Sequence, residues 1–436
     1  MTLLSVVLAV LVLVLLIAWG KVQPFVAFIV SALVAALLLG MPLEKISGSI
    51  QRGIGDFLGS LAVIIGVGAM FGKLIADSGA AQRIATTLIG LFGSKRIIFA
   101  MACTGFVVGI PLFYNVGFVI LVPLVFSITY QSKLPPVYLG VPLLAGLSIC
   151  HGFLPPHPAP AAIVIQFGAD IGLTLFYGVV VGIPTLLITG PLFAQTLRKM
   201  ASVPSELFTP KPMDEAKLPG AFNSFVCALL PVVLIGAATA LAYAPGIGPY
   251  KPLLSLLGDP MLVMLFSLFV ATISLGLARG TKLKPLMESY GQAIRDIAIV
   301  LLIVAGAGAL KQVFVDSGAD ATIGRELQSL AVPPLILGWF IAMIIRICLG
   351  SATAAGLTAA GIVQPLVMSS GVNRNLMVLA IGAGSLMFSH VNDSAFWMFK
   401  EYFNLSLKDT FRSWTLMETL IGVFGLCFIL LLNAAL

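Results

Sequence analysis

Charge is scarce in this chain. Only 9% of its 436 residues are charged, whereas 59% are hydrophobic and the mean hydropathy is +1.11. A soluble domain of this length could not bury so much apolar surface, so the composition predicts an all-α polytopic membrane protein. The formal net charge of +7 is better explained by lysine and arginine on the cytoplasmic side of a bilayer than by a nucleic-acid surface. The expected surroundings are therefore lipid, with no nucleic-acid partner.

Cysteine and histidine are also rare. The five cysteines lie in apolar stretches without metal-ligand spacing, and the three histidines form no His-Glu-x-x-His pattern. We therefore expect small buried cysteines, no metal site and no cofactor. The first apolar run, at 2–19, has no charge before it and no recognisable cleavage site. This pattern predicts a first membrane helix rather than a removed signal peptide.

Two unrelated landmarks recur at one offset along the chain. His151 and His390 lie 239 positions apart, and the motif from Asp77 to Ala80 returns 239 positions later. The shared offset indicates an internal duplication. The predicted parts are a first repeat, a hydrophilic linker and a second repeat, at 1–197, 198–220 and 221–436. A duplicated membrane protein with paired broken helices is typical of a secondary transporter.

Apolar runs long enough to cross about 30 Å of hydrocarbon predict ten membrane-crossing segments. They lie at about 2–19, 23–41, 54–76, 137–170, 172–197, 221–243, 260–278, 290–315, 374–405 and 413–434. Two more apolar segments, at 97–130 and 335–369, are interrupted by glycine-rich patches and are predicted to be re-entrant hairpins. Amphipathic stretches at 77–95 and 316–332 are expected at the membrane interfaces.

The positions of lysine and arginine support this assignment. If both hairpins turn back, each half crosses the membrane an odd number of times, so the two repeats are inverted. Both termini then lie outside, and the cytoplasmic loops hold most of the basic residues, as the positive-inside rule requires. The hairpin at 97–130 enters from the cytoplasm, the hairpin at 335–369 enters from outside, and the linker at 198–220 is cytoplasmic.

Four polar, helix-breaking patches fall inside the apolar segments. They lie at 109–115, 150–158, 350–356 and 389–394. Non-helical backbone at membrane depth persists only where it is buried in protein or lines a watery cavity. Helix ends there expose N–H groups that bind anions. A kink without function is the alternative for any single break, but four matching breaks in two halves favour one shared site near the middle.

The ionisable residues of these segments leave alternatives open. His151, His157 and His390 either line the site or hydrogen-bond a neighbouring helix. A carboxylate inside the membrane is energetically costly, which makes Asp393 a functional candidate. The alternative is that Asp393 caps the half-helix that follows it. Arg346 would hold a substrate carboxylate, pair with a structural acid or extend outwards to the interface.

Three motifs resemble the gluconate permease family, the gluconate:proton symporters. They are GIPLFYNVG at 109–117, HGFLPPHP at 151–158 and VNDSAFW at 391–397. The likeness covers essentially the whole chain in length and motif order. It implies a carrier rather than an enzyme, located in the bacterial inner membrane, that imports gluconate or a related sugar acid by proton symport. It also implies the elevator architecture of the ion-transporter superfamily, with a scaffold, a mobile transport domain and a homodimer.

The resemblance and the polar breaks together suggest site residues. A sugar acid presents one carboxylate, which needs N–H dipoles or a cation, and several hydroxyls, which need amide and hydroxyl partners. The predicted substrate-binding residues are Tyr114, Asn115, His151, His157, Arg346, Ser351, Thr353, Asn392 and Ser394. Proton coupling needs a group that titrates near neutral pH, as histidine does. The predicted proton-coupling residues are Asp393, His390 and His151.

The polar residues also predict two functional parts. The hairpin and broken helix of each half, at 97–170 and 335–405, hold most of the intramembrane polar residues and are predicted to form the transport domain. The apolar helices at 1–76 and 221–315 are predicted to form the scaffold. Related carriers often use Ser-Asn-Thr hairpin tips that also bind sodium, and this chain departs from that pattern, which favours protons. A sodium-coupled or other organic-anion carrier of the same fold is the alternative, ahead of a channel or an intramembrane enzyme.

Overall fold

The computed structural model describes residues 2–204, 213–242, 244, 248–319, 322, 326 and 332–436. All regular elements in these ranges are helical, which confirms the predicted all-α class. Within the described ranges, eight helices are long and apolar enough to cross a membrane, and several shorter apolar helices accompany them. Part of the predicted linker at 198–220 and most of the predicted amphipathic stretch at 316–332 lie outside the described residues.

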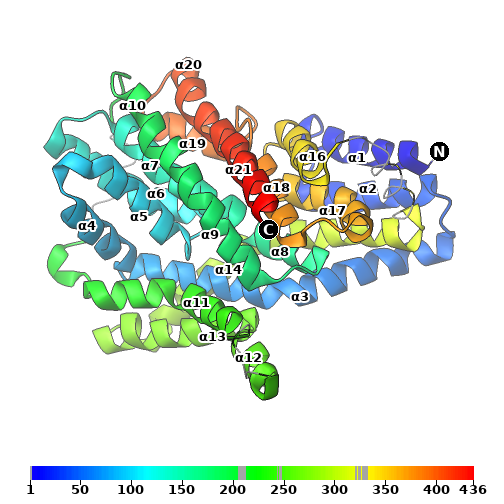
Figure 1. Cartoon of the computed structure of the whole chain (residues 1–436), viewed down its shortest axis with the longest axis horizontal. Coiled ribbons are helices and arrows are strands. Elements are labelled where there is room, and N and C mark those ends of the chain that lie inside the picture. The colour runs from blue at the N-terminus through cyan, green and yellow to red at the C-terminus, as the bar shows by residue number, and fades with distance from the viewer. Residues whose placement is uncertain are drawn as a thin grey trace.

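Two long helices run side by side through the molecule (Figure 1). They are α3 (Leu43–Asp77) and α14 (Leu283–Asp316), of 35 and 34 residues, and each is about 50 Å long at 1.5 Å per residue. A side chain at Gly53 or at Gly308 would meet the backbone carbonyl of the other glycine, so their backbones are in close contact. Both helices extend well beyond the apolar runs predicted at 54–76 and 290–315. The additional turns of α3 are amphipathic and bury Ile46 against the core.

Each of the four predicted breaks separates two helices. The pairs are α5 (Ile97–Gly109) and α6 (Tyr114–Ser132), α7 (Pro136–Phe153) and α8 (Pro158–Phe167), α16 (Pro334–Leu349) and α17 (Ala352–Ser370), and α18 (Arg374–Leu386) and α19 (Ser394–Tyr402). Gly350, between α16 and α17, has φ +75°, a backbone conformation that glycine adopts at little cost. The directions in which α5–α6 and α16–α17 cross or re-enter a bilayer stay predictions.

The remaining helices surround this centre. They are α1 (Thr2–Ala18), α2 (Pro24–Leu38), α4 (Ala80–Phe92), α9 (Ile171–Leu187), α10 (Phe193–Leu197), α11 (Ala221–Ala242), α12 (Lys251–Leu257), α13 (Pro260–Ala271), α20 (Leu407–Thr410) and α21 (Leu416–Ala435). Helix α7 is almost entirely buried and packs on α5, α9, α18 and α21. Small residues permit this packing, since a side chain on Gly146 of α7 would meet the backbone of α5.

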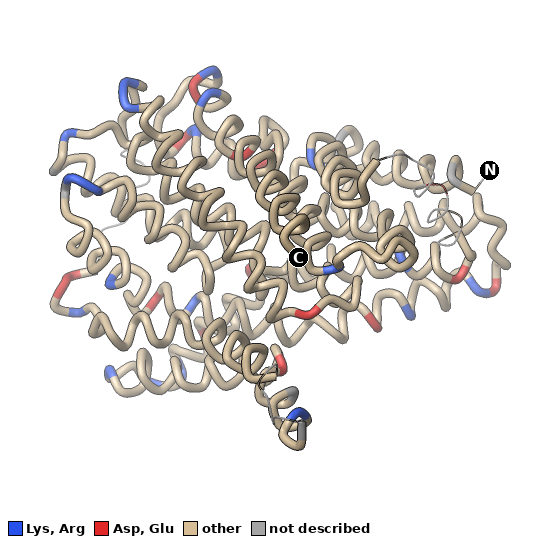
Figure 2. Tube along the Cα trace, in the orientation of Figure 1, with Lys and Arg blue, Asp and Glu red and all other residues tan. Residues whose placement is uncertain are grey.

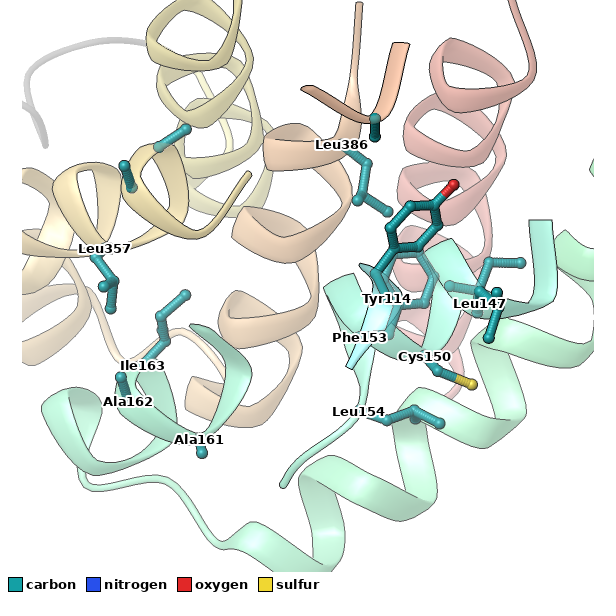
Figure 3. Close-up of a cluster of buried hydrophobic side chains, with 14 of the residues drawn as sticks. Tyr114, Leu147, Cys150, Phe153, Leu154, Ala161, Ala162, Ile163, Leu357 and Leu386 are labelled. Carbon is teal, nitrogen blue, oxygen red and sulfur yellow. The ribbon is translucent and has the colours of Figure 1, made fainter. Parts of the chain in front are cut away.

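The break between α7 and α8 rests on an apolar cluster (Figure 3). Phe153 is the last residue of α7, and Leu154 follows it as the C-cap. Ile163 of α8 faces Leu357 of α17. The ring of Tyr114 lies against the same cluster, with its hydroxyl directed away from Phe153. Apolar packing therefore fixes the two halves of the broken helix and holds the phenol in one orientation.

Charged residues are concentrated at the ends of the helices. Figure 2 shows lysine and arginine gathered where α4, α10 and α20 lie, at the left and top of the view. The predicted topology assigns these loops to the cytoplasm. Two ion pairs mark opposite ends of the α3–α14 pair, Arg52 with Asp316 at 2.8 Å and Lys73 with Asp77 at 3.0 Å. The inverted relation of the two repeats stays a prediction.

The topology can be tested by cysteine labelling. In a cysteine-free background, a single cysteine introduced at Lys217 should react with a membrane-impermeant maleimide only after the membrane is opened. Cysteines added at either terminus should react in intact cells. Labelling of the two termini from opposite sides would contradict the predicted even number of crossings.

Candidate functional site

A cavity of about 610 Å³ lies where the breaks meet. It is bounded by the tips of α5–α6 and α16–α17, the breaks in α7–α8 and α18–α19, helix α21, the last turns of α3 and the middle of α14. Its volume is typical of a small-molecule site. The cavity brings together eight of the residues predicted from sequence: Tyr114, Asn115, His151, Arg346, Ser351, Thr353, Asp393 and Ser394.

Four helices begin at this cavity, namely α6, α8, α17 and α19. The Ser351 hydroxyl accepts from the Ala354 N–H at 3.3 Å, and a carboxylate oxygen of Asp393 accepts from the Ala395 N–H at 2.9 Å. Helix α6 begins without a side-chain cap, so the first N–H groups of that helix are left for a ligand or water. The positive ends of four helix dipoles converge on one volume, which favours an anion there.

Arg346 and Asp393 form an ion pair in the cavity wall. The Arg346 side chain is only 3% exposed, which excludes the outward orientation. Asp393 also accepts a hydrogen bond from Ser389 at 2.5 Å, and Ser389 accepts one from the Trp414 indole at 2.7 Å. Asp393 is therefore both a cap of α19 and the partner of a buried guanidinium, which are two of the alternatives that the sequence left open.

Several buried polar atoms in the cavity wall have no hydrogen-bond partner in the described part of the chain. Among the described residues, Nε and Nη1 of Arg346, the Tyr114 hydroxyl and Nδ1 of His151 are buried and form no hydrogen bond. Each unsatisfied buried polar group costs about 1–3 kcal/mol, so such groups call for a ligand or water. All three side chains line the same cavity. The cavity wall thus offers unsatisfied polar atoms, including guanidinium donors, to a polar, negatively charged ligand.

Three predicted site residues do not line this cavity. His157 Nε2 lies 2.8 Å from the Gly109 carbonyl, at the tip of α5–α6. His390 Nε2 lies 3.1 Å from the carbonyl of Ile347, and the Asn392 amide donates to the same oxygen at 2.8 Å. These side chains connect the broken helices to the two tips. They therefore hold the tips in place by hydrogen bonds and do not face the cavity themselves.

A buried carboxylate on α21 was not among the residues predicted from the sequence. Glu418 lines the cavity, is 2% exposed and accepts a hydrogen bond from Ser148 of α7 at 2.5 Å. A signal was present, since a lone glutamate inside the apolar run at 413–434 is costly in a membrane and is a functional candidate for that reason. Trp414 and Ser148 were missed with it.

The wall formed by α3 and α14 carries a second set of charges. Lys73, Asp77 and Asp296 line the cavity, and Ser289 donates to Asp77 at 2.7 Å. Asp77 is the last residue of α3. Within the described residues, no three His, Cys, Asp or Glu side chains converge in a way that could hold a metal ion.

Comparison with known proteins identifies the family. The model described as GntP family permease matches residues 1–435. This chain belongs to the GntP family of permeases. It is 46% identical to the high-affinity gluconate transporter of Escherichia coli K12, over 99% of both chains. It is 44% identical to the Gnt-II system L-idonate transporter of the same organism, over 95% of both chains. The resemblance based on the three sequence motifs is confirmed.

The fold of this GntP permease is also that of a solved transporter. It is similar to the YdaH transporter of Alcanivorax borkumensis, with a TM-score of 0.68 over 94% of this chain and 97% of that chain. The sequence identity is 16%, so the likeness concerns the fold alone. Family membership and the apolar helices together make this chain a multi-pass protein of the bacterial inner membrane.

Proposed function

We propose that this GntP permease imports gluconate or a related sugar acid together with protons. The observation that carries the proposal is the convergence of four helix N-termini and the unpaired donors of Arg346 on one cavity. A carboxylate would satisfy both the helix dipoles and the guanidinium. The relatives named for gluconate and L-idonate support the same class of substrate.

The rest of the cavity wall suits the polyol part of such a substrate. Asn115, Thr353 and Ser394 supply amide and hydroxyl groups that can both donate and accept hydrogen bonds. The Tyr114 hydroxyl and Nδ1 of His151 have no protein partner and could bond to substrate hydroxyls. In this proposal the carboxylate binds near Arg346 and the sugar chain extends towards α6.

We further propose the division into a transport domain and a scaffold. The hairpins and broken helices, at 97–170 and 335–405, would carry the cavity. The helices at 1–76 and 221–315 would form the scaffold and the contacts of a homodimer. The exposed apolar residues of α11 and α13, such as Phe222, Phe266 and Phe269, suit lipid or a second copy of the chain.

Uptake by proteoliposomes tests the proposed function. Purified protein should accumulate labelled gluconate when the lumen is alkaline, and a gradient of one pH unit should support about tenfold accumulation for one proton per substrate. A protonophore should abolish this accumulation, and a sodium gradient alone should produce none. Accumulation driven only by sodium would favour the alternative carrier, and flux without any accumulation would favour a channel.

A further inference from the structure

Two of the carboxylates that line the cavity, Asp393 and Glu418, lie in opposite surroundings. Asp393 has three donors, namely the Arg346 guanidinium, the Ser389 hydroxyl and the Ala395 N–H. Glu418 is 2% exposed, and its only hydrogen bond in the described part of the chain is with the Ser148 hydroxyl. One acid is thus paired with a cation and the other is not.

The surroundings of Glu418 supply little positive charge. Arg346 is the one cation close to it on the α16 side, and that guanidinium is already paired with Asp393. Tyr114 and His151 are the other titratable groups on the near wall, while Lys73, Asp77 and Asp296 belong to the opposite wall formed by α3 and α14. Helices α9 and α18 pack on α21 and contribute no charged side chain to the cavity lining.

A buried carboxylate without a cation is costly when ionised, and it avoids the cost by binding a proton. Binding of the substrate makes protonation of Glu418 still more favourable. A bound sugar acid adds a second negative charge beside the single guanidinium that already serves Asp393. An ionised Glu418 would add a third, so loading of the cavity with an anion favours the protonated form of Glu418.

We propose that Glu418 is the site that binds the symported proton, with Ser148 as its positioning residue. Asp393 serves as the partner of Arg346 and is not the proton carrier. The inference rests on the proposed proton symport. The step is a simple protonation. An O–H bond forms on the Glu418 carboxylate when substrate loads from outside, and it breaks when substrate and proton leave to the cytoplasm.

The test compares two isosteric variants, Glu418→Gln and Asp393→Asn, in proteoliposomes. Counterflow of labelled against unlabelled gluconate requires no net proton movement, whereas accumulation on a pH gradient does. Glu418→Gln should keep counterflow within about threefold of wild type, an order-of-magnitude expectation for a neutral isostere that keeps the site filled. Its counterflow should no longer depend on pH, and its accumulation ratio should fall to equilibrium. Asp393→Asn should lose both activities, because Arg346 then lacks its counter-ion.

The outcomes separate the inference from the proposed function. If wild-type protein does not accumulate gluconate on a pH gradient, the proposed symport is wrong and the inference is wrong with it. If wild type accumulates and Glu418→Gln does so equally, only the inference is wrong. A Glu418→Gln protein that elutes as a folded species but loses counterflow as well would overturn the assignment in favour of a structural role. The reverse result, counterflow without accumulation in Asp393→Asn, would assign the proton to Asp393.

Discussion

Replacing Arg346 with alanine is expected to lower the affinity for gluconate at least about 30-fold, because removing one partner of a buried, hydrogen-bonded charge pair costs about 2–5 kcal/mol of binding free energy. Two separate losses contribute. The substrate carboxylate loses the guanidinium that we propose as its partner, and Asp393 becomes a buried charge without a counter-ion. Thermal stability should therefore fall together with affinity. Binding of labelled gluconate to detergent-purified protein and the melting temperature measure the two effects.

A second substitution separates these losses. The double variant Arg346→Ala/Asp393→Ala removes both charges, so most of the lost stability should return, apart from about 1 kcal/mol for the missing cap of α19. Affinity should not return, since the guanidinium that we propose as the partner of the substrate carboxylate is absent. Arg346→Lys keeps the charge but has fewer donors, and it should bind more weakly than wild type. Recovery of wild-type affinity in the double variant would show that Arg346 serves only Asp393.

The breaks of the helices could be predicted because their causes are local. Three prolines within four positions, Pro155, Pro156 and Pro158, disfavour a continuous helix, and Gly350 permits a backbone conformation that other residues rarely adopt. The ends of α3 could not be predicted in the same way. The apolar run begins near residue 54, but the helix begins at Leu43, because its polar turns bury one face against neighbouring helices. Hydropathy identifies the part of a helix that is in contact with lipid. The helix itself extends further, as long as its backbone hydrogen bonds and its packing contacts continue.

The candidate site shows the same difference between local and tertiary information. The polar residues in and beside the breaks can be read from the sequence, and Arg346, Asp393 and Ser351 do meet in one cavity. The sequence does not indicate the direction of each side chain. His390, for example, lies in a break but contacts the carbonyl of Ile347. Glu418 reaches the cavity only because α21 packs on α7 and α18, a contact between distant segments that no motif records.

The cavity wall suggests how the permease moves. One side consists of hairpin tips and helix breaks, and the other consists of the continuous helices α3 and α14. A second, small cavity lies between the two proposed domains and is lined by Phe113 at the first tip, Gly68 of α3 and Ala228 of α11. If the transport domain moves as a rigid body, contacts across this boundary must break during each cycle, while contacts within the transport domain persist.

Crosslinking is expected to stop transport only across that boundary. In a cysteine-free background, Phe113→Cys with Ala228→Cys places two thiols on one small cavity, where Hg²⁺ can bridge them. This bridge should reduce gluconate uptake to background, and a thiol competitor should restore it. The matched control is Gly356→Cys with Ser385→Cys, both within the transport domain, where the Cβ atoms would lie 3.7 Å apart. That spacing suits a disulfide, and the bridge should leave uptake largely intact. Uptake that survives the boundary crosslink would exclude rigid displacement, because the tip of α5–α6 would then stay at the scaffold throughout transport, and gating by the tips alone would explain alternating access.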